Sequence, residues 1–166
     1  MTKKLLLIRH AKSSWDDASI ADMDRPLNSR GIKNAPEMAR RLKKLNIVPD
    51  VLISSHALRA LETARLFAAE FGFAADKIHI RPELYLAGTD EFQSVISSLD
   101  DNWNVVALFS HNPGITEMAN QLSNARIDNM PTASIFGARF IQPRWVDIVN
   151  VQGEFWFFDY PKSKDR

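Results

Sequence analysis

The sequence predicts an α/β fold, a three-layer α/β/α sandwich whose mostly parallel central sheet has an antiparallel edge. Two observations lead to this fold class. Short apolar runs alternate with helical patterns along most of the chain, which is typical of parallel strands joined by crossover helices. Two further strand-like runs, 134–141 and 154–158, follow near the end of the sequence. We expect these two runs to pair antiparallel at one edge of the sheet.

The expected parallel strands are short and strongly apolar. The first, 4–8, contains four successive large aliphatic residues. A run of this kind predicts a central strand that is buried on both faces. The other strands are expected at 51–53, 78–80 and 105–109.

Four helices are expected in addition. In the first, 29–45, apolar residues recur at helical spacing, and Lys and Arg residues lie on the opposite face, where we expect solvated surface. Ser29 is the expected N-cap of this helix. The other helices are expected at 57–71, 89–99 and 115–122. The polar stretch 13–30 is expected to be a long loop, and loops of that length are commonly functional.

Composition limits the class of protein. A chain of 166 residues fits one domain, 1–166, with a full hydrophobic core. The formal net charge is +1, from 21 basic and 20 acidic residues, so no strong overall field favours nucleic acid or a membrane surface as a partner. Cysteine is absent, which excludes disulfides and thiolate chemistry and fits a reducing compartment. Because we find neither a signal peptide nor an apolar run that could span a membrane, we expect a cytoplasmic protein.

Polar clusters follow three of the expected strands. These clusters are Arg9 with His10, Ser54 and Ser55 leading to Arg59, and Ser110 with His111. The carboxyl ends of parallel strands lie along one edge of a sheet, so this fold brings the clusters together. Each cluster alone is compatible with an ordinary strand end at the surface. Together they predict a cationic pocket for phosphate, because Arg side chains bind phosphate oxygens and imidazole can donate a proton or attack.

These residues resemble the histidine phosphatase superfamily, which is also called phosphoglycerate mutase-like. Arg9-His10-Ala11 is similar to its Arg-His-Gly signature, with alanine in place of glycine. Segments 54–64 and 110–114 resemble the motifs that carry its phosphate-binding Arg and its second His, and 24–27 with Gly31 resembles the turn into its first helix. Within the superfamily, the sequence Arg-His-Ala-Lys-Ser, the small size of the chain and the segment 159–162 are most similar to the SixA-type phosphohistidine phosphatases.

The resemblance implies a phosphoglycerate mutase-like fold and a two-step phosphoryl transfer. His10 would attack phosphorus to form a phosphohistidine enzyme, which water then hydrolyses. Arg9, Arg59 and His111 would bind the phosphoryl oxygens and stabilise the transition state. Ser13 matches a position that lines the pocket in larger relatives. The implied enzyme is a metal-independent hydrolase that needs no cofactor.

One departure from the family pattern bears on the substrate. Phosphomonoesterases of this superfamily carry a carboxylic acid that protonates the leaving alkoxide. In the corresponding region here, 81–86, Leu86 stands in the place of the acid if Leu84 is the anchor, and Glu83 is the nearest candidate. Imidazole needs this proton less than an alkoxide does, because its conjugate acid has a pKa of about 6.5.

We therefore expect a phosphatase that acts on phosphohistidine in a protein, whose surface a shallow pocket can reach. Two alternatives stay open from the sequence. The first is a phosphomonoesterase for a small phosphorylated molecule. Its general acid would be Glu83 or an Asp of the loop 16–24, which contains Asp16 and Asp17. The second is a phosphate-binding module without catalysis, which the alanine in the signature makes conceivable.

Overall fold

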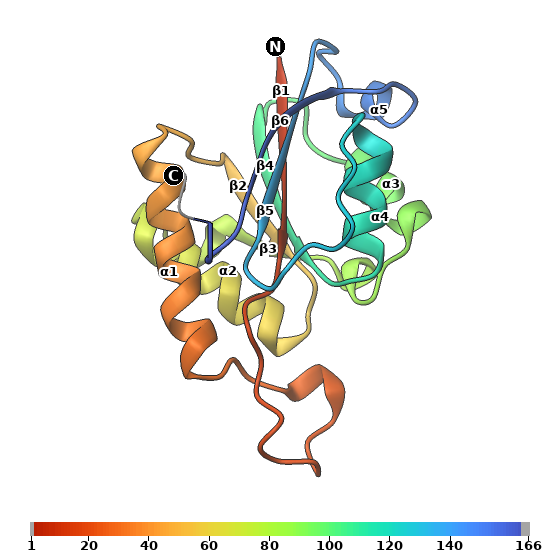
Figure 1. Cartoon of the computed structure of the whole chain (residues 1–166). Coiled ribbons are helices and arrows are strands. Elements are labelled where there is room, and N and C mark those ends of the chain that lie inside the picture. Colours follow the sequence, from red (N-terminus) through yellow and green to blue (C-terminus); the bar gives the residue numbers. More distant parts are fainter. Residues whose placement is uncertain (1, 164–166) are drawn as a thin grey trace.

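The computed structural model describes residues 2–163, which fold around a six-stranded sheet (Figure 1). The strands are β1 (Lys3–Arg9), β2 (Val51–Ser54), β3 (Ile78–Ile80), β4 (Val105–Ser110), β5 (Ile135–Phe140) and β6 (Glu154–Asp159). Their order across the sheet is β3-β2-β4-β1-β5-β6. The pairs among β1 to β4 are parallel, whereas β5 is antiparallel to β1 and β6 to β5. The predicted parallel sheet with an antiparallel edge is confirmed.

Helices cover both faces of the sheet. Helices α1 (Ser29–Lys44) and α2 (Leu58–Phe71) lie on one face, and α3 (Thr89–Ser97), α4 (Gly114–Leu122) and α5 (Trp145–Ile148) lie on the other (Figure 1). Three short 3-10 turns complete the described elements: η1 (Asp22–Asp24), η2 (Ala75–Lys77) and η3 (Pro82–Leu84). The three-layer sandwich is therefore the architecture that the sequence predicts.

The central strand β1 supplies side chains to two separate cores. Leu5 and Leu7 pack into the cluster under α3 and α4, whereas Leu6 and Ile8 pack into the cluster under α1 and α2. All four side chains are fully buried. Replacing one such leucine by alanine costs about 2–5 kcal/mol in a protein core. The apolar run of β1 thus holds the two helical layers together and fixes where the strand ends.

Three local predictions differ from the structure. The N-cap of α1 is Asn28, whose side chain accepts the backbone N–H of Gly31 at 2.9 Å, and Ser29 lies in the first turn instead. The expected loop 13–30 contains η1 and an isolated bridge between Ser13 and Leu27. Helix α5 was not predicted, because four residues are too few to establish a helical pattern.

The sheet order places the three polar clusters at neighbouring strand ends. Strand β4 lies between β2 and β1, so the clusters follow three adjacent strands. Arg9 pairs with Ser110, and Ser54 pairs with Phe109, so these strands also end at the same level. Among the described residues, no helix is both long and apolar enough to cross a membrane.

Candidate active site

A small pocket lies at the carboxyl ends of β1, β2 and β4. Its volume is about 180 Å³. The residues that line it are Arg9, His10, Lys12, Ser13, Trp15, Arg25, Arg59, Leu86, His111, Asn112 and Thr132. All four residues of the predicted catalytic set, together with Ser13, are among them. The structure therefore brings the three sequence clusters into one cavity.

The ring of His10 is oriented by its own backbone segment. Its Nδ1 atom lies 2.8 Å from the carbonyl oxygen of Ala11, a geometry that requires Nδ1 to carry the hydrogen. The other nitrogen, Nε2, therefore keeps its lone pair. Burial lowers the pKa of His10 to about 3, and the nearby cations Arg59 and Arg9 act in the same direction. At neutral pH the imidazole is uncharged and able to attack an electrophile.

The ring of His111 is held by Ser55, 5.2 Å from the ring of His10 between centroids. Ser55 Oγ lies 2.7 Å from Nε2 of His111 and also accepts the backbone N–H of Ala57 at 3.3 Å. Because Ser55 Oγ already accepts from Ala57, its own hydroxyl hydrogen is free to donate to Nε2 of His111. Nε2 is then the acceptor of the ring, so the ring hydrogen lies on Nδ1. Burial lowers the pKa of His111 to about 3, with further contributions from His10 and Arg59. Nδ1 is thus a neutral donor.

Three residues that line this pocket each carry a buried nitrogen without a hydrogen-bond partner among residues 2–163. These nitrogens are Nε of Arg9, Nε of Arg59 and Nδ1 of His111. Buried donors are nearly always hydrogen-bonded, and an unsatisfied one costs about 1–3 kcal/mol. Burial, with the charge of Arg59, lowers the pKa of Arg9, which indicates that this cation is poorly solvated. An oxyanion in the pocket would accept from these groups and offset their charge.

Asp22 is a site residue that the sequence reasoning missed. Arg59 donates from Nη1 to the Asp22 carbonyl oxygen at 2.8 Å and from Nη2 to its carboxylate at 3.1 Å. The same carboxylate accepts the hydroxyl of Tyr85 at 2.6 Å and pairs with Arg25 at 3.1 Å. The hydrogen bond from Tyr85, together with Arg59, lowers the pKa of Asp22 to about 2. It is therefore a charged anchor for the two guanidinium groups rather than a proton donor.

No simple sequence signal identifies Asp22. The loop 13–30 is rich in aspartate, and the sequence does not distinguish Asp22 from Asp16 and Asp17 within 16–24. Asp16 and Asp17 are exposed and absent from the pocket lining, and Asp17 bonds to Ser19. What distinguishes Asp22 is its contact with Arg59 on α2, which is a tertiary feature.

The other predicted residues fall into two groups. Ser13 is buried in the pocket wall, where its hydroxyl accepts a hydrogen bond from Arg25 at 2.7 Å. Leu86 also lines the cavity, and its backbone has a positive φ of 50°. Glu83 is not brought to the pocket: its exposed carboxylate pairs with Arg81 at 2.8 Å, and this hydrogen bond lowers its pKa. Within residues 2–163, we find no group of three or more His, Asp or Glu side chains placed to hold a metal ion.

Residues 5–85 match the family model described as histidine phosphatase superfamily (branch 1). A chloroplastic protein of Arabidopsis thaliana is 36% identical over 135 residues, which cover 76% of this chain and 62% of that protein. The residues that match the family model include Arg9, His10 and Arg59, so this part of the chain is similar to the histidine phosphatase superfamily. The chain is also 38% identical over 68 residues to a 2,3-bisphosphoglycerate-dependent phosphoglycerate mutase of Cutibacterium acnes, covering 40% of this chain and 27% of the mutase. The chain thus spans under two thirds of the length of these relatives.

Solved structures of two other proteins have the same fold. A protein histidine phosphatase SixA complexed with tungstate matches with a TM-score of 0.76 at 21% identity, over 95% of this chain and 97% of that chain. A proposed phosphohistidine phosphatase SixA from Agrobacterium tumefaciens matches with a TM-score of 0.74 at 26% identity, over 83% of this chain and 91% of that chain. The predicted resemblance to the SixA-type members is confirmed at the level of fold.

Alanine is compatible with the backbone at the glycine position of the superfamily signature. Positive φ among the described non-glycine residues occurs at Asn46, Leu86 and Ala133, and so not at Ala11. The methyl group of Ala11 is buried in the core under α1 and α2. Its N–H donates to the hydroxyl of Thr63 at 3.0 Å, while its carbonyl oxygen orients His10. The substitution therefore preserves the local geometry on which His10 depends.

Proposed function

We propose that this protein is a phosphatase that removes the phosphoryl group from phosphohistidine in a protein, through a covalent intermediate on His10. One observation carries the proposal. Arg9, Arg59 and His111 each carry an unpartnered buried nitrogen, and they line the same 180 Å³ cavity as an imidazole whose Nε2 is unprotonated. A tetrahedral phosphoryl group supplies the acceptors that these donors lack and the electrophile that this nitrogen can attack.

In the first step the Nε2 lone pair of His10 forms a bond to phosphorus. The bond from phosphorus to the substrate nitrogen breaks, and its electron pair stays on the departing imidazole. The other nitrogen of that ring carries a proton taken from solvent, so the ring leaves as neutral imidazole. Arg9, Arg59 and the Nδ1–H of His111 hold the three equatorial oxygens, whose charge spreads in the transition state. Because these donors are fixed in place before the reaction, they stabilise this charge without reorganisation.

In the second step a water molecule attacks the phosphorus of phospho-His10. The P–N bond breaks, its electron pair returns to Nε2, and inorganic phosphate leaves with the proton balance completed by solvent. The hydrogen bond from Nδ1 to the Ala11 carbonyl keeps the ring in one orientation through both steps. The same residues thus serve the formation and the hydrolysis of the intermediate.

The preference for phosphohistidine rests on the absence of a carboxylic acid. No Asp or Glu is among the described residues that line the pocket, and Leu86 occupies its wall. Asp22 has a pKa of about 2 and is ionised at neutral pH, so it cannot protonate a leaving group there. An alkoxide leaves very poorly without such a proton. The ring of phosphohistidine instead takes a proton from solvent on its other nitrogen and then departs as neutral imidazole.

The preference for a protein substrate rests on access. Trp15 and Leu86 line the cavity and yet are 71% and 55% exposed, so its mouth is an open apolar rim. A rim of this kind suits contact with a second macromolecular surface. The likeness to structures named as SixA phosphohistidine phosphatases supports the same substrate class.

The intermediate is tested by rapid quenching with a ³²P-labelled phosphohistidine peptide. We expect a labelled protein whose bond is labile in acid and stable in base, and we expect His10→Asn to abolish it and to lower kcat at least about a thousandfold. His79→Asn, which replaces a histidine of β3 outside the pocket, is the matched control. It should still form the labelled intermediate and should keep the wild-type kcat. A wild-type protein that binds the peptide without forming the labelled species would be a binding module and not an enzyme.

The substrate class is tested by comparing phosphohistidine peptides with alkyl phosphates. We expect kcat/KM for the alkyl phosphates to be lower by at least about a thousandfold, because their leaving group lacks a general acid. Glu83→Gln should leave turnover of phosphohistidine unchanged. Efficient hydrolysis of an alkyl phosphate that collapses in Glu83→Gln would instead establish a small-molecule phosphomonoesterase.

The cytoplasm is the compartment that we propose, because the cysteine-free composition fits reducing conditions. Cell fractionation with an antibody against the native protein tests this location. Recovery in an organelle or at a membrane would contradict it.

A further inference from the structure

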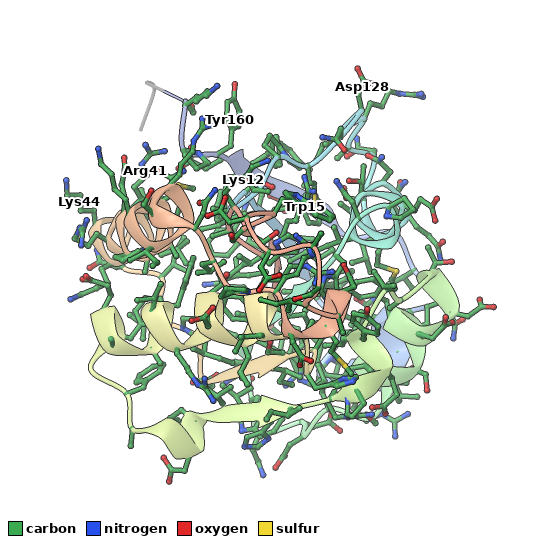
Figure 2. All side chains as sticks on the ribbon, turned by 90° about the horizontal axis from the view of Figure 1, so that it is seen from below. Lys12, Trp15, Arg41, Lys44, Asp128 and Tyr160 are labelled. Carbon is green, nitrogen blue, oxygen red and sulfur yellow. The ribbon has the colours of Figure 1, made fainter. Side chains whose placement is uncertain are left out.

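A second pocket adjoins the one around His10. It has a volume of about 330 Å³ and shares Lys12 and Thr132 with the first pocket. Its other lining residues come from the start of α1, from the segment before β5 and from the chain after β6: Arg30, Asn34, Pro131, Tyr160, Pro161 and Lys162. Figure 2 shows Lys12 between Tyr160 of the second pocket and Trp15 of the first. The two cavities are therefore neighbours along one face.

The second pocket holds positive charge that the described part of the chain does not neutralise. Lys12, Arg30 and Lys162 line it, and none of them forms a side-chain hydrogen bond or ion pair with residues 2–163. No Asp or Glu of this range is in the lining. By contrast, Arg25 and Arg59 beside the first pocket are each paired with the carboxylate of Asp22. Clustered cations of like sign repel one another, and a bound anion relieves that repulsion.

One wall of the second pocket is fixed by Arg41. From Nη1 it donates to the Tyr160 carbonyl oxygen at 2.9 Å and to the carboxylate of Asp159 at 3.1 Å. From Nη2 it donates to the carbonyl oxygen of Pro161 at 3.0 Å. These bonds anchor the chain that follows β6, so Tyr160 and Pro161 form a firm surface rather than a loose tail. Figure 2 shows Arg41 beside Tyr160.

The opposite wall is fixed by close contact between Lys12 and the start of α1. The backbone N–H of Asn28 donates to the carbonyl oxygen of Lys12 at 3.0 Å. Gly31 packs so tightly against the same oxygen that a Cβ atom at this position would lie 2.3 Å from it. The backbone of Lys12 is therefore held against the helical turn that carries Arg30. A site whose parts are held in place before binding loses less entropy when a ligand arrives.

We propose that this second pocket is a subsite for a second anionic group on the same molecule whose phosphoryl group occupies the pocket of His10. The inference rests on the proposed function of that first pocket. Lys12, Arg30 and Lys162 supply the charge, and the rings of Tyr160 and the two prolines offer apolar surface to the carbon chain that joins the two anionic groups. In a phosphorylated protein, this group is the carboxylate of an Asp or Glu next to the phosphohistidine.

The subsite is tested first by binding, which needs no turnover. Calorimetry compares phosphonoalkanoic acids of increasing chain length with alkylphosphonates of the same length. We expect one intermediate length at which the added carboxylate tightens binding about tenfold, the sum of two or three partly exposed ion contacts. A carboxylate that adds nothing at any length, while alkylphosphonates still bind, would overturn the subsite alone. A protein that binds no phosphonate at all would overturn the proposed function together with it.

Two matched variants locate the effect. Arg30→Gln combined with Lys162→Gln removes two cations that line only the second pocket, and we expect the carboxylate advantage to fall from about tenfold to about twofold or less. Lys33→Gln removes a charge from the same helix at an exposed position that lines neither pocket, and it should keep the tenfold advantage. An advantage that survives in the double variant would contradict the assignment.

Turnover then identifies the source of the anionic group. Phosphohistidine peptides with Glu beside the phosphorylated residue should show about tenfold higher kcat/KM than peptides with Gln there, and the double variant should lose this ratio. A preference confined to small phosphorylated hydroxy acids over phosphorylated alcohols would assign the subsite to a small-molecule substrate. Equal kcat/KM for Glu and Gln peptides, together with equal kcat/KM for phosphorylated hydroxy acids and alcohols, would overturn the role of the subsite in substrate selection.

Discussion

Ser55 controls which nitrogen of His111 carries the ring hydrogen. Its Oγ atom lies 2.7 Å from Nε2, and Ser55 is fully buried. With Nε2 accepting from this hydroxyl, Nδ1 is left as the donor of the ring. Without the hydroxyl, the proton is free to reside on either nitrogen, and one of the two tautomers cannot donate to a phosphoryl oxygen.

We expect Ser55→Ala to lower kcat about tenfold to a hundredfold, because orienting partners of this kind commonly have effects of that size. KM should change much less, since both arginines still bind the phosphoryl group. Ser54→Ala is the matched control, because Ser54 donates to the Ser55 carbonyl oxygen and does not line the pocket. Steady-state kinetics on a phosphohistidine peptide measures both variants. A loss in kcat that is equal for Ser54→Ala and Ser55→Ala would mean that the effect is merely structural.

His10 and His111 make the stability of the free protein depend on pH. Their folded pKa values are lowered to about 3, whereas an unfolded imidazole has a pKa of about 6.5. Between these values the unfolded chain binds more protons than the folded one. The free energy of unfolding therefore falls as pH decreases below about 6.5 and is level above it.

Replacing His10 by asparagine removes one of the two contributors to this pH dependence. From about pH 7 to pH 5, we expect the variant to lose about 1–2 kcal/mol less unfolding free energy than the wild type. Urea denaturation in phosphate-free buffer provides the measurement, because bound phosphate would stabilise the charged imidazoles. Identical losses in the two proteins would show that His10 is not held neutral by the fold.

The sequence predicted most of the site because its residues follow strand ends. Arg9, His10, Arg59 and His111 needed only the rule that parallel strands end at one edge, and the structure brings them together as expected. Asp22 and Ser55 could not be assigned roles in this way, since their partners on α2 and after β4 are distant in sequence. Whether Glu83 takes part in catalysis stays a prediction, although its pairing with Arg81 holds it away from the cavity.

At the scale of elements, the basic face of α1 shows where a sequence pattern stops being informative. The prediction of solvated surface is right for Arg40, whose side chain is 53% exposed, and wrong for Arg41, whose side chain is 16% exposed. Helical periodicity identifies which side chains point away from the sheet. It cannot show that the chain after β6 returns across that side and covers Arg41.

This difference predicts unequal effects on stability from two adjacent arginines. Arg41→Gln should lower the free energy of unfolding by about 1–3 kcal/mol, because it removes the hydrogen bonds that Arg41 donates to two carbonyl groups and to the carboxylate of Asp159. Arg40→Gln removes an exposed pair with Glu70 and should change it by at most about 1 kcal/mol. Chemical denaturation of both variants at neutral pH measures the difference. Equal effects would mean that Arg41 does not anchor the chain after β6.

At the scale of the whole molecule, the net charge is small, but positive side chains gather around two neighbouring pockets. The formal net charge is +1, yet Arg9, Lys12, Arg25 and Arg59 line one small cavity, and Arg30 and Lys162 line the next. Composition correctly excluded a strong overall field but could not show how the charges are distributed. We therefore expect an anionic substrate to be attracted to one face by a local potential that salt can screen.

We expect kcat/KM for a phosphohistidine peptide to fall about fivefold as sodium chloride rises from about 0.1 M to about 1 M, where the Debye length shrinks from about 10 Å to about 3 Å. In this range kcat should change less than about twofold, because groups in contact with the phosphoryl group are screened far less than groups at a distance. Two variants with the same net charge separate a local field from an overall one. Lys12→Gln, at a residue shared by the two pockets, should reduce the salt dependence, and Lys33→Gln, which lines neither, should leave it unchanged. The same reduction in both variants would attribute substrate attraction to total charge and would contradict a focused cationic face.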